Sequence, residues 1–365
     1  MDPLIGRVLD ARYRLVAFIG EGAMGKVYKA ERADGTGLVA VKILNEDCSI
    51  DPALRERFER EARALFGLSH PHILDVQDYG VLDGRQPYLV MELLEGQNLE
   101  AMIESGNLDP QLALRLARQF LEGLAFAHSQ GVLHRDLKTE NLFVVRRPDG
   151  VPHVKLLDFG LVKFVDDERW GEGKKLTVAG SVMGSPAYMS PEQGTGGQMD
   201  ARSDVYSAGV VLYEVLTGAW PFIGESRMDM LKQHLLTPVP PLRAGRPELR
   251  ARPELDALIT KAMAKEPGDR FSDAQAMLAA FDSIPGPVVS LGAPVAPPPA
   301  RPFPAASAAA PIPPPNKPMA GTPMAAPAPM TPGPMAPAPV PSPPVKAAPM
   351  MPAMSPAPTA PVMGL

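Results

Sequence analysis

Residues 20–27 read GEGAMGKV, and this octet fits two phosphate-binding patterns at once. As Gly20-x-Gly22-x-x-Gly25 it is a glycine loop, and as Gly20-x-x-x-x-Gly25-Lys26 it is one residue short of a P-loop. A P-loop and a dinucleotide-binding loop both open a helix, and a P-loop also needs Ser or Thr after its lysine. Here a valine follows Lys26, and the residues KVYKAER have strand character. The octet is therefore predicted to turn between two antiparallel strands, where missing side chains let backbone N–H groups approach phosphates.

The flanking sequence predicts a small β-rich lobe. Strands are expected at residues 13–20, 26–32, 38–44 and 88–94. Each of these segments alternates or runs apolar, and Asp34-Gly35 is a strong hairpin signal between the second and the third. Asp51-Pro52 starts a helical period that holds to Leu68. The first lobe is therefore expected to be a sheet with one long helix.

Helices dominate the sequence from Asp109 onward. The segment 109–131 starts with Asp-Pro and repeats apolar residues four apart, at Leu112, Leu116, Phe120 and Leu124. Two short strands are expected at residues 141–145 and 153–158, and residues 203–218 are apolar nearly all round, which is typical of a buried central helix. The predicted fold class is α+β, with a small β-rich N-lobe and a larger helical C-lobe.

The end of the chain has a different composition. Residues 285–365 consist mostly of Pro, Ala and Met, and their charges are Arg301, Lys317 and Lys346. Such a segment cannot bury enough apolar area to offset its ordering entropy. It is predicted to be a disordered tail.

Composition and charge restrict the function classes. The net charge of −5 gives no footprint for nucleic acid. A single cysteine, Cys48, excludes an internal disulfide and suits a reducing compartment. The N-terminus lacks the apolar region of a signal peptide, and no stretch reaches the ~18 apolar residues of a membrane span. A cytoplasmic protein without a membrane span and without a nucleic-acid partner is expected.

Five motifs, in a fixed order along the chain, resemble those of protein kinases. They are GEGAMGKV at 20–27, VAVK ending at Lys42, HRDLKTEN at 134–141, DFG at 158–160 and SPE at 190–192. The chain is similar to the Ser/Thr protein kinases, specifically the eukaryote-like, Hanks-type kinases of bacteria. The resemblance implies a kinase domain over residues 13–282, with an N-lobe over about 13–94 and a C-lobe over about 95–282.

The resemblance implies ATP and Mg²⁺, or Mn²⁺ in its place, as cofactors. Lys42 would hold the α- and β-phosphates and pair with a glutamate of the first long helix. Glu61 is the candidate, because it falls within the apolar stripe of Leu54, Phe58 and Leu65. ATP-binding residues are expected at Ile19, Gly20, Glu21, Gly22, Ala23, Met24, Gly25, Lys26, Val27, Ala40, Lys42, Met91, Glu92 and Leu94.

The catalytic loop carries the residues that the resemblance assigns to the chemistry. Asp136 would orient the proton of the acceptor hydroxyl, and Lys138 would offset the charge of the transferring phosphoryl group. Asn141 and Asp158 would hold Mg²⁺ through hard oxygen ligands. Lysine at position 138 is what Ser/Thr kinases carry, so protein substrates with aliphatic hydroxyls are expected.

Supporting roles follow from the same resemblance. His134 and Phe159 would be packing contacts. Asp204 would anchor the catalytic-loop backbone, although a helix N-cap is the alternative. Glu192 and Arg270 would form a buried bidentate pair, unless Arg270 lies on the surface.

Three residues depart from the family pattern. Thr139 replaces the commoner proline, Ser185 replaces threonine, and Ser190 replaces alanine. Each residue keeps the size or the hydroxyl of the usual one, so the domain is expected to be active.

The segment before SPE is expected to regulate activity. Arg135 precedes the catalytic aspartate, and in kinases with this arginine a phosphate on the activation segment typically neutralises it. Thr177 is the preferred autophosphorylation site and Ser181 the next, whereas Ser185 is expected to be structural.

Two other functions remain open from the sequence. The kinase fold could serve as a scaffold, with PSPPVK and PIPPPNKP in the tail as polyproline II segments for partners that bind proline-rich motifs. A small-molecule phosphotransferase of similar fold is disfavoured by the long activation segment, which serves protein substrates.

Overall fold

The computed structural model describes residues 2–22, 25–45, 62–106, 108–146, 150–159, 185–242 and 252–285. All of these ranges belong to one compact unit, residues 1–306. Among the expected site residues, the ones outside the described ranges are Ala23, Met24, Glu61, Thr177 and Ser181. Most of the helix expected from Asp51 and the expected tail beyond Pro285 also lie outside them, although residues 62–66 are helical.

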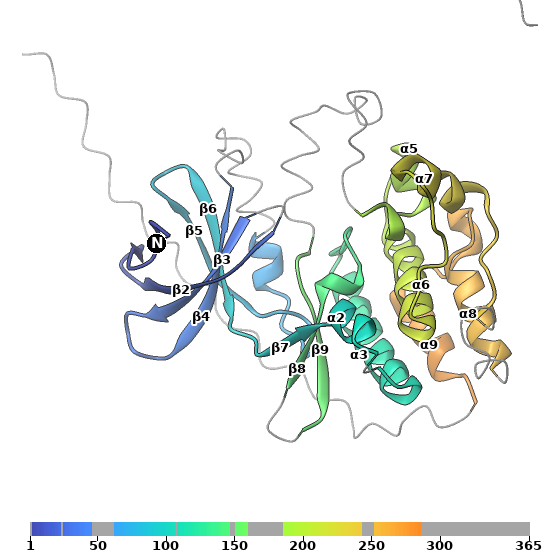
Figure 1. The fold of residues 1–365 in the computed structure, drawn as a ribbon, viewed down its shortest axis with the longest axis horizontal. Coiled ribbons are helices and arrows are strands. Elements are labelled where there is room, and N and C mark those ends of the chain that lie inside the picture. Colours follow the sequence, from blue (N-terminus) through green and yellow to red (C-terminus); the bar gives the residue numbers. More distant parts are fainter. Residues whose placement is uncertain are drawn as a thin grey trace, which may run out of the picture. The chain divides into compact units, whose positions relative to one another are not determined.

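Among the described residues, six strands form an antiparallel sheet in the order β1-β2-β3-β4-β6-β5 (Figure 1). They are β1 (Val8–Leu9), β2 (Tyr13–Gly22), β3 (Gly25–Arg32), β4 (Leu38–Leu44), β5 (Val76–Leu82) and β6 (Gln86–Glu92). β2 ends and β3 begins within the glycine octet, where Gly22 pairs with Gly25. At Gly25 a Cβ atom would lie 2.2 Å from the Ile43 carbonyl oxygen, so a side chain cannot be placed there. The predicted antiparallel strands on either side of this turn are confirmed, while Ala23 and Met24 lie outside the described residues.

β4 shows how the sequence sets the two faces of this sheet, because successive strand residues point to opposite faces. The odd-numbered residues from Val39 to Ile43 belong to an apolar cluster confined to the N-lobe. Ala40 and Leu44 belong to the other apolar cluster, which continues into the helices of the C-lobe. Lys42 lies between Ala40 and Leu44, so the strand period alone turns its side chain toward the C-lobe.

Helices make up most of the second lobe, with a small sheet of strands β7-β8-β9. The elements up to Leu156 are β7 (Gly96–Asn98), α2 (Leu99–Glu104), α3 (Pro110–Ser129), η2 (Thr139–Asn141), β8 (Leu142–Arg146) and β9 (Pro152–Leu156). The later elements are η3 (Pro186–Tyr188), α5 (Pro191–Thr195), α6 (Ala201–Thr217), α7 (Arg227–Leu236), α8 (Pro253–Ala262), η6 (Pro267–Asp269) and α9 (Ala274–Asp282).

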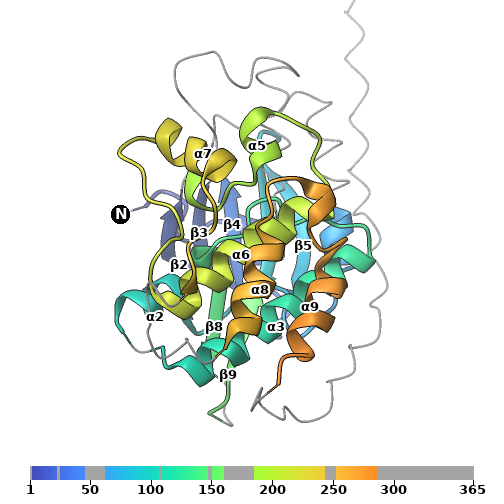
Figure 2. The same ribbon diagram turned by 90° about the vertical axis from the view of Figure 1, so that its right-hand side faces the viewer.

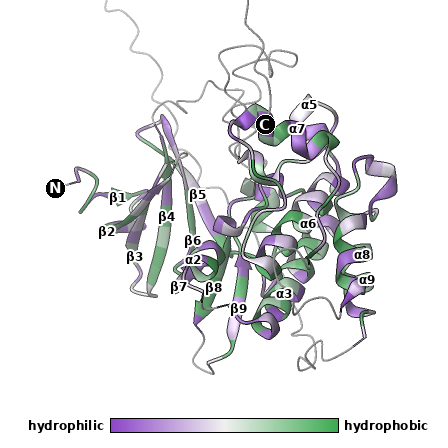
Figure 3. Ribbon diagram, turned by 45° about the vertical axis from the view of Figure 1, so that its right-hand side comes forward, coloured by the Kyte–Doolittle hydropathy of each residue, from purple (hydrophilic) through white to green (hydrophobic). Residues whose placement is uncertain are grey.

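Helix α6 is the centre of the C-lobe. Every residue from Ser203 to Leu216 is buried, and α6 packs against α3, α8 and α9 (Figure 2). Hydrophobic residues run along α6, as Figure 3 shows. The predicted buried central helix is confirmed, and so is the α+β fold with a β-rich N-lobe and a helical C-lobe. No helix within the described ranges is both long and apolar enough to cross a membrane.

Sequence patterns missed part of the N-lobe sheet. β5 was not predicted, because Asp78 and Gly80 interrupt its apolar residues. Asp78 is nevertheless buried, since it accepts a hydrogen bond from the Tyr13 hydroxyl at 2.6 Å and pairs with Arg12 at 2.5 Å. These two long-range partners replace the water that a buried carboxylate loses. The strand expected to run to Leu94 ends at Glu92.

Candidate active site

Two charged side chains, one from the N-lobe and one from the C-lobe, form a contact between the two lobes. Lys42 Nζ, on β4, donates a hydrogen bond to Asp158 Oδ1 at 2.6 Å. Asp158 follows β9 and has a φ of 48°, a left-handed conformation that costs free energy in a residue with a side chain. The sequence predicted a ligand contact for each residue, and the structure shows that they also pair with each other.

The carboxylate of Asp204 holds the backbone of the catalytic loop. It accepts hydrogen bonds from the backbone N–H groups of His134 and Arg135, both at 2.7 Å, and from His128 Nε2 at 3.0 Å. Burial raises the pKa of Asp204, but the His128 and backbone hydrogen bonds outweigh it and hold the pKa below its usual value. The N-cap of α6 is Asp200, so the predicted anchoring role of Asp204 is confirmed and the capping alternative is wrong.

The loop turns sharply at Arg135, the second of its two anchored residues. Arg135 has a φ of 63°, which again places a residue with a side chain in the left-handed region. The ring centroids of His134 and Phe159 lie 4.6 Å apart, which confirms the predicted packing contact. His134 is fully buried, and burial lowers its pKa, so the neutral ring is favoured.

Asn141 connects the catalytic loop to the segment that carries Asp158. Its Nδ2 donates to the Asp136 carbonyl oxygen at 2.8 Å and to the Asp136 carboxylate at 3.3 Å. Its backbone carbonyl accepts from the N–H of Leu157 at 2.8 Å. Because the amide nitrogen faces Asp136, the amide oxygen is the atom suited to a cation. Lys138 lies beside Asp136 in the loop, with its Nζ 3.5 Å from Glu140.

Three of the residues expected around adenine, Val27, Ala40 and Met91, lie at the apolar cluster that continues into the C-lobe. Ala40 is buried there and Val27 packs against the same cluster. Met91 is 8% exposed and lines a hollow with Phe159 and Asp158. Ile19 is 51% exposed near the end of β2.

Glu92 has contacts that the sequence did not indicate. Its backbone N–H donates to the Asp75 carbonyl oxygen at 3.0 Å. Its carboxylate accepts from the Asp75 N–H at 2.8 Å and from Lys155 Nζ at 2.6 Å. Sequence reasoning missed Lys155, whose one signal was a charge inside the apolar strand β9. Because the N–H of Glu92 is engaged, its carbonyl oxygen and the backbone of Leu94 are the groups suited to a base.

Arg270 and Glu192 form a bidentate pair, with Nη1–Oε1 at 2.7 Å and Nη2–Oε2 at 2.8 Å. The guanidinium also donates to three backbone carbonyl oxygens, of Ala264, Lys265 and Arg202. The Arg270 side chain is 0% exposed, so the predicted buried pair is confirmed and the surface alternative is wrong.

Comparison with known proteins accounts for this arrangement. The family model described as "Protein kinase domain" matches residues 13–281. The chain belongs to the protein kinase family. This finding confirms the resemblance on which the site was predicted.

Relatives of this kinase domain include bacterial serine/threonine-protein kinases. The chain is 38% identical over 284 residues to the serine/threonine-protein kinase pkn3 of Myxococcus xanthus, which covers 78% of this chain and 52% of pkn3. It is 40% identical over 284 residues to PknL of Mycobacterium tuberculosis, and this alignment covers 78% of this chain and 68% of PknL. The crystal structure of the M. tuberculosis PknI kinase domain aligns with a TM-score of 0.60 and 28% identity, over 76% of this chain and 98% of that one. The chain thus spans about half the length of pkn3.

A buried polar network lies behind the catalytic loop of the kinase domain. The Tyr188 hydroxyl donates to Glu214 Oε2 at 2.7 Å and accepts from Trp220 Nε1 at 3.1 Å. Thr139 Oγ1 lies 2.8 Å from the same hydroxyl. Burial raises the pKa of Glu214 to about 7, although the Tyr188 and Thr139 hydrogen bonds lower it and Glu140 raises it further. Sequence reasoning did not single out Glu214, because it reads as one polar residue within an apolar helix.

The Glu214 carboxyl should make the free energy of unfolding depend on pH. In the unfolded chain the pKa of Glu214 has its ordinary value of 4.5. The folded state therefore binds the Glu214 proton more tightly than the unfolded chain does. Its contribution is therefore complete below pH 4.5 and is lost as the pH rises toward about 7. Glu214→Gln keeps the Tyr188 acceptor without titrating. Between pH 4.5 and pH 8 we expect the variant to gain about 3 kcal/mol in unfolding free energy relative to wild type.

Urea unfolding at a series of pH values measures this difference. The exposed Glu225 provides the control substitution, Glu225→Gln, for which the stability curve should run parallel to that of wild type. A Glu214→Gln curve that also runs parallel would show that Glu214 does not titrate in this range.

Proposed function

We propose that this chain is a Ser/Thr protein kinase that transfers the γ-phosphoryl group of ATP to Ser and Thr hydroxyls of protein substrates. The contact of Lys42 with Asp158 at 2.6 Å is the observation that carries the proposal. It places the lysine of the β-lobe at the aspartate of the DFG motif, while Asn141 ties that aspartate's segment to Asp136.

The chain offers suitable groups for ATP and Mg²⁺. A Cβ atom on Gly20 or Gly22 would meet no described atom within 4 Å, so the backbone there is open to a ligand. Asn141 and Asp158 offer amide and carboxylate oxygens, which are the ligand types of Mg²⁺ and also suit Mn²⁺. Within the described ranges no group of three or more His, Cys, Asp or Glu side chains is arranged to hold a metal ion. A cation here would take its other ligands from phosphates and water.

Each residue of the site then has a defined task. When bound, ATP supplies the phosphoryl group and Mg²⁺ neutralises the charge on its oxygens. Lys42 and Asp158 exchange their mutual contact for phosphate and cation. Asp136 orients the acceptor hydroxyl and takes its proton. Lys138 offsets the negative charge of the transferring phosphoryl group. Adenine would lie against Ala40 and the other residues expected around it, which are Ile19, Val27 and Met91.

Three matched basic peptides that differ only in their acceptor residue test this function. With ATP and Mg²⁺ we expect phosphate on the Ser and Thr peptides and none on the Tyr peptide, because Lys138 and the loop around it serve a short aliphatic hydroxyl. Phosphate on the Tyr peptide alone, or on none of the three, would contradict the proposal.

We also propose that phosphorylation of Thr177 activates the enzyme by pairing with Arg135 and letting Glu61 reach Lys42. Mass spectrometry of the active enzyme should find phosphate on Thr177. Thr177→Ala should lower activity on a peptide, whereas Ser181→Ala, the matched control, should have a smaller effect. An unmodified Thr177, or full activity of Thr177→Ala, would refute this regulation.

The proline-rich residues beyond Pro285 are proposed to recruit partners rather than to support chemistry. Removing residues 287–365 should therefore leave the melting temperature and the activity on a peptide unchanged, because this segment lacks acids and periodic apolar residues. A large fall in either quantity would show that the segment docks on the kinase domain. A domain that binds PxxP motifs should retain the full chain and release the shortened one. The single cysteine supports a cytoplasmic location.

A further inference from the structure

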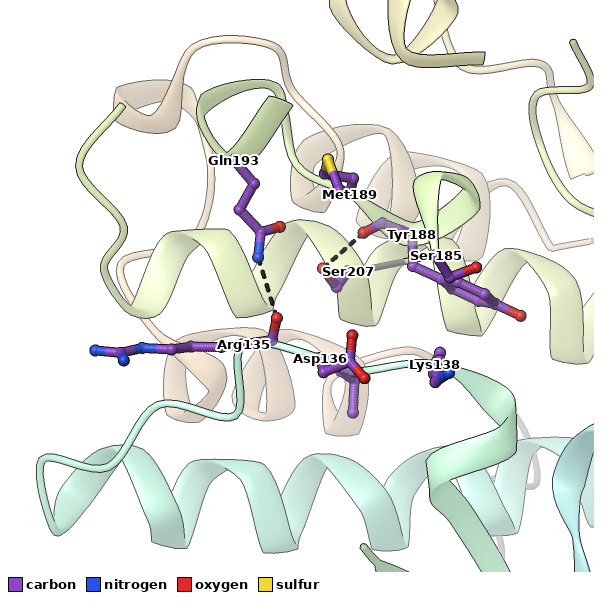
Figure 4. Close-up of a pocket in the computed structure, with 9 residues that line it drawn as sticks. Arg135, Asp136, Lys138, Ser185, Tyr188, Met189, Gln193 and Ser207 are labelled. Atoms are coloured by element: carbon purple, nitrogen blue, oxygen red, sulfur yellow. Dashed lines mark hydrogen bonds between the residues drawn. The ribbon is translucent and has the colours of Figure 1, made fainter. Parts of the chain in front are cut away.

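The catalytic loop contacts the segment 185–193 on both sides of Asp136. Before Asp136, the Arg135 carbonyl oxygen accepts a hydrogen bond from Gln193 Nε2 at 3.2 Å (Figure 4). After it, Thr139 Oγ1 lies 2.8 Å from the Tyr188 hydroxyl. Asp136 therefore sits on a short stretch of chain that is attached to this segment at both ends.

The amide of Gln193 has a fixed orientation. Its Oε1 accepts from the backbone N–H of Ser190 at 2.9 Å, so its Nε2 is directed to Arg135. The Arg135 residue has the left-handed φ of 63°, and Asp204 accepts from its N–H. A backbone in this conformation persists only where its surroundings hold it. Gln193 on the carbonyl and Asp204 on the N–H are two such contacts.

The direction of the second contact follows from counting hydrogens. The single hydrogen of the Tyr188 hydroxyl goes to Glu214, at 2.7 Å. The Thr139 hydroxyl is then the donor toward the Tyr188 oxygen, and it shares its hydrogen with Glu214, whose pKa the same hydroxyl lowers. Thr139 is 0% exposed, so no water competes for its hydroxyl. Proline, the commoner residue of the family at this position, has no hydroxyl and cannot make this contact.

A hollow beside the loop is lined by Asp136, Lys138, Ser185, Tyr188, Met189 and Gln193 among others, so each contact has at least one partner in its wall, whereas Thr139 itself lies behind Tyr188 (Figure 4). Ser207 Oγ also donates to the Tyr188 carbonyl oxygen at 2.8 Å, which ties this wall of the hollow to α6. In the proposed reaction the acceptor hydroxyl approaches Asp136 through this hollow. We propose that Thr139 and Gln193 are positioning residues, which hold Asp136 and Lys138 in register with the segment 185–193 that lines the other side of this hollow.

This inference rests on the proposed kinase function, and it predicts different effects on KM and on kcat. Thr139 and Gln193 are not among the residues assigned to ATP, so their loss should leave the KM for ATP unchanged. The loss should lower kcat, because a displaced Asp136 meets the acceptor hydroxyl in a poorer geometry. One hydrogen bond is worth about 1 kcal/mol, which corresponds to a fall of about fivefold for each contact.

Isosteric variants separate the two contacts from the packing around them. Thr139→Val removes the hydroxyl and keeps the branched shape, and Thr139→Ser restores the hydroxyl. Gln193→Glu keeps an oxygen for the Ser190 N–H and replaces the donor that faces Arg135. Ser190→Ala is the matched control, because it removes the Ser190 Oγ contact to the Gln193 N–H and leaves the Gln193 side chain in place.

Steady-state kinetics of peptide phosphorylation, with melting temperatures, decide the matter. We expect kcat to fall about fivefold in Thr139→Val and in Gln193→Glu, and to stay within about twofold of wild type in Thr139→Ser and Ser190→Ala. The KM for ATP should stay constant throughout. Wild-type kcat in Thr139→Val and Gln193→Glu would overturn the inference. So would equal kcat values for Thr139→Val and Thr139→Ser, or a fall in kcat that follows the melting temperature.

Hydrogen exchange of the full chain gives a readout that needs no kinase activity. The backbone amides of residues 134–141 should exchange faster in Thr139→Val and Gln193→Glu than in wild type, while those of helix α3 stay unchanged. Unchanged exchange in the loop would overturn the two contacts. A wild-type chain that phosphorylates no peptide would instead overturn the proposed function.

Discussion

Asp136→Asn should lower kcat for peptide phosphorylation by about 10²- to 10⁴-fold, the usual contribution of a positioned general base. Asparagine has the shape of aspartate but cannot take the proton of the acceptor hydroxyl. The loop should keep its conformation, since Asp204 and Asn141 hold it mainly through backbone groups, at 2.7 to 2.8 Å. The KM for ATP should change little, because Asp136 is not among the residues assigned to it.

A kinetic assay of ADP release in the presence of peptide measures this effect. Asp109→Asn is the matched control, because Asp109 caps helix α3 and asparagine caps a helix about as well. It should retain wild-type kcat. A folded Asp136→Asn protein with a rate close to that of wild type would show that Asp136 is not the base.

Arg270→Met should be the most destabilising of the substitutions considered, with a loss of about 3 to 5 kcal/mol in the free energy of unfolding. The guanidinium makes five hydrogen bonds, two to Glu192 and three to backbone carbonyl oxygens. Methionine fills a similar volume but leaves the Glu192 carboxylate, whose side chain is 12% exposed, without its cation. The cost therefore comes from a buried charge that has lost its partner.

Urea unfolding compares this variant with Arg202→Met. Arg202 pairs with Asp200 at 2.6 Å, but its side chain is 38% exposed, so its loss should cost far less than the loss of Arg270. Similar losses for the two variants would mean that burial does not determine the strength of the Glu192–Arg270 pair.

Local patterns predicted the elements that carry the site. The alternation of β4 turns Lys42 toward the C-lobe, and Asp109 followed by proline starts α3 where it was expected. The motif order placed Asp204 and the Glu192–Arg270 pair in roles that their hydrogen bonds confirm. These features depend on short segments or on a pattern shared by the whole family, and both are visible in one sequence.

Contacts between distant segments could not be predicted in this way. Thr139 and Tyr188 are 49 residues apart, and no spacing rule connects two hydroxyls at that distance. The burial of Asp78 depends on Tyr13 and Arg12, which a local apolar pattern ignores. The pairing of Lys42 with Asp158 likewise depends on two lobes meeting, because each residue alone was assigned to a ligand.

The proposed reaction moves the γ-phosphoryl group of ATP to a protein hydroxyl. The most direct measurement incubates the full chain with a generic basic protein, Mg²⁺ and ATP labelled at either the α- or the γ-phosphorus. We expect label on serine and threonine of that protein from γ-labelled ATP and none from α-labelled ATP. Protein label from α-labelled ATP, or release of labelled inorganic phosphate with no labelled protein, would contradict it.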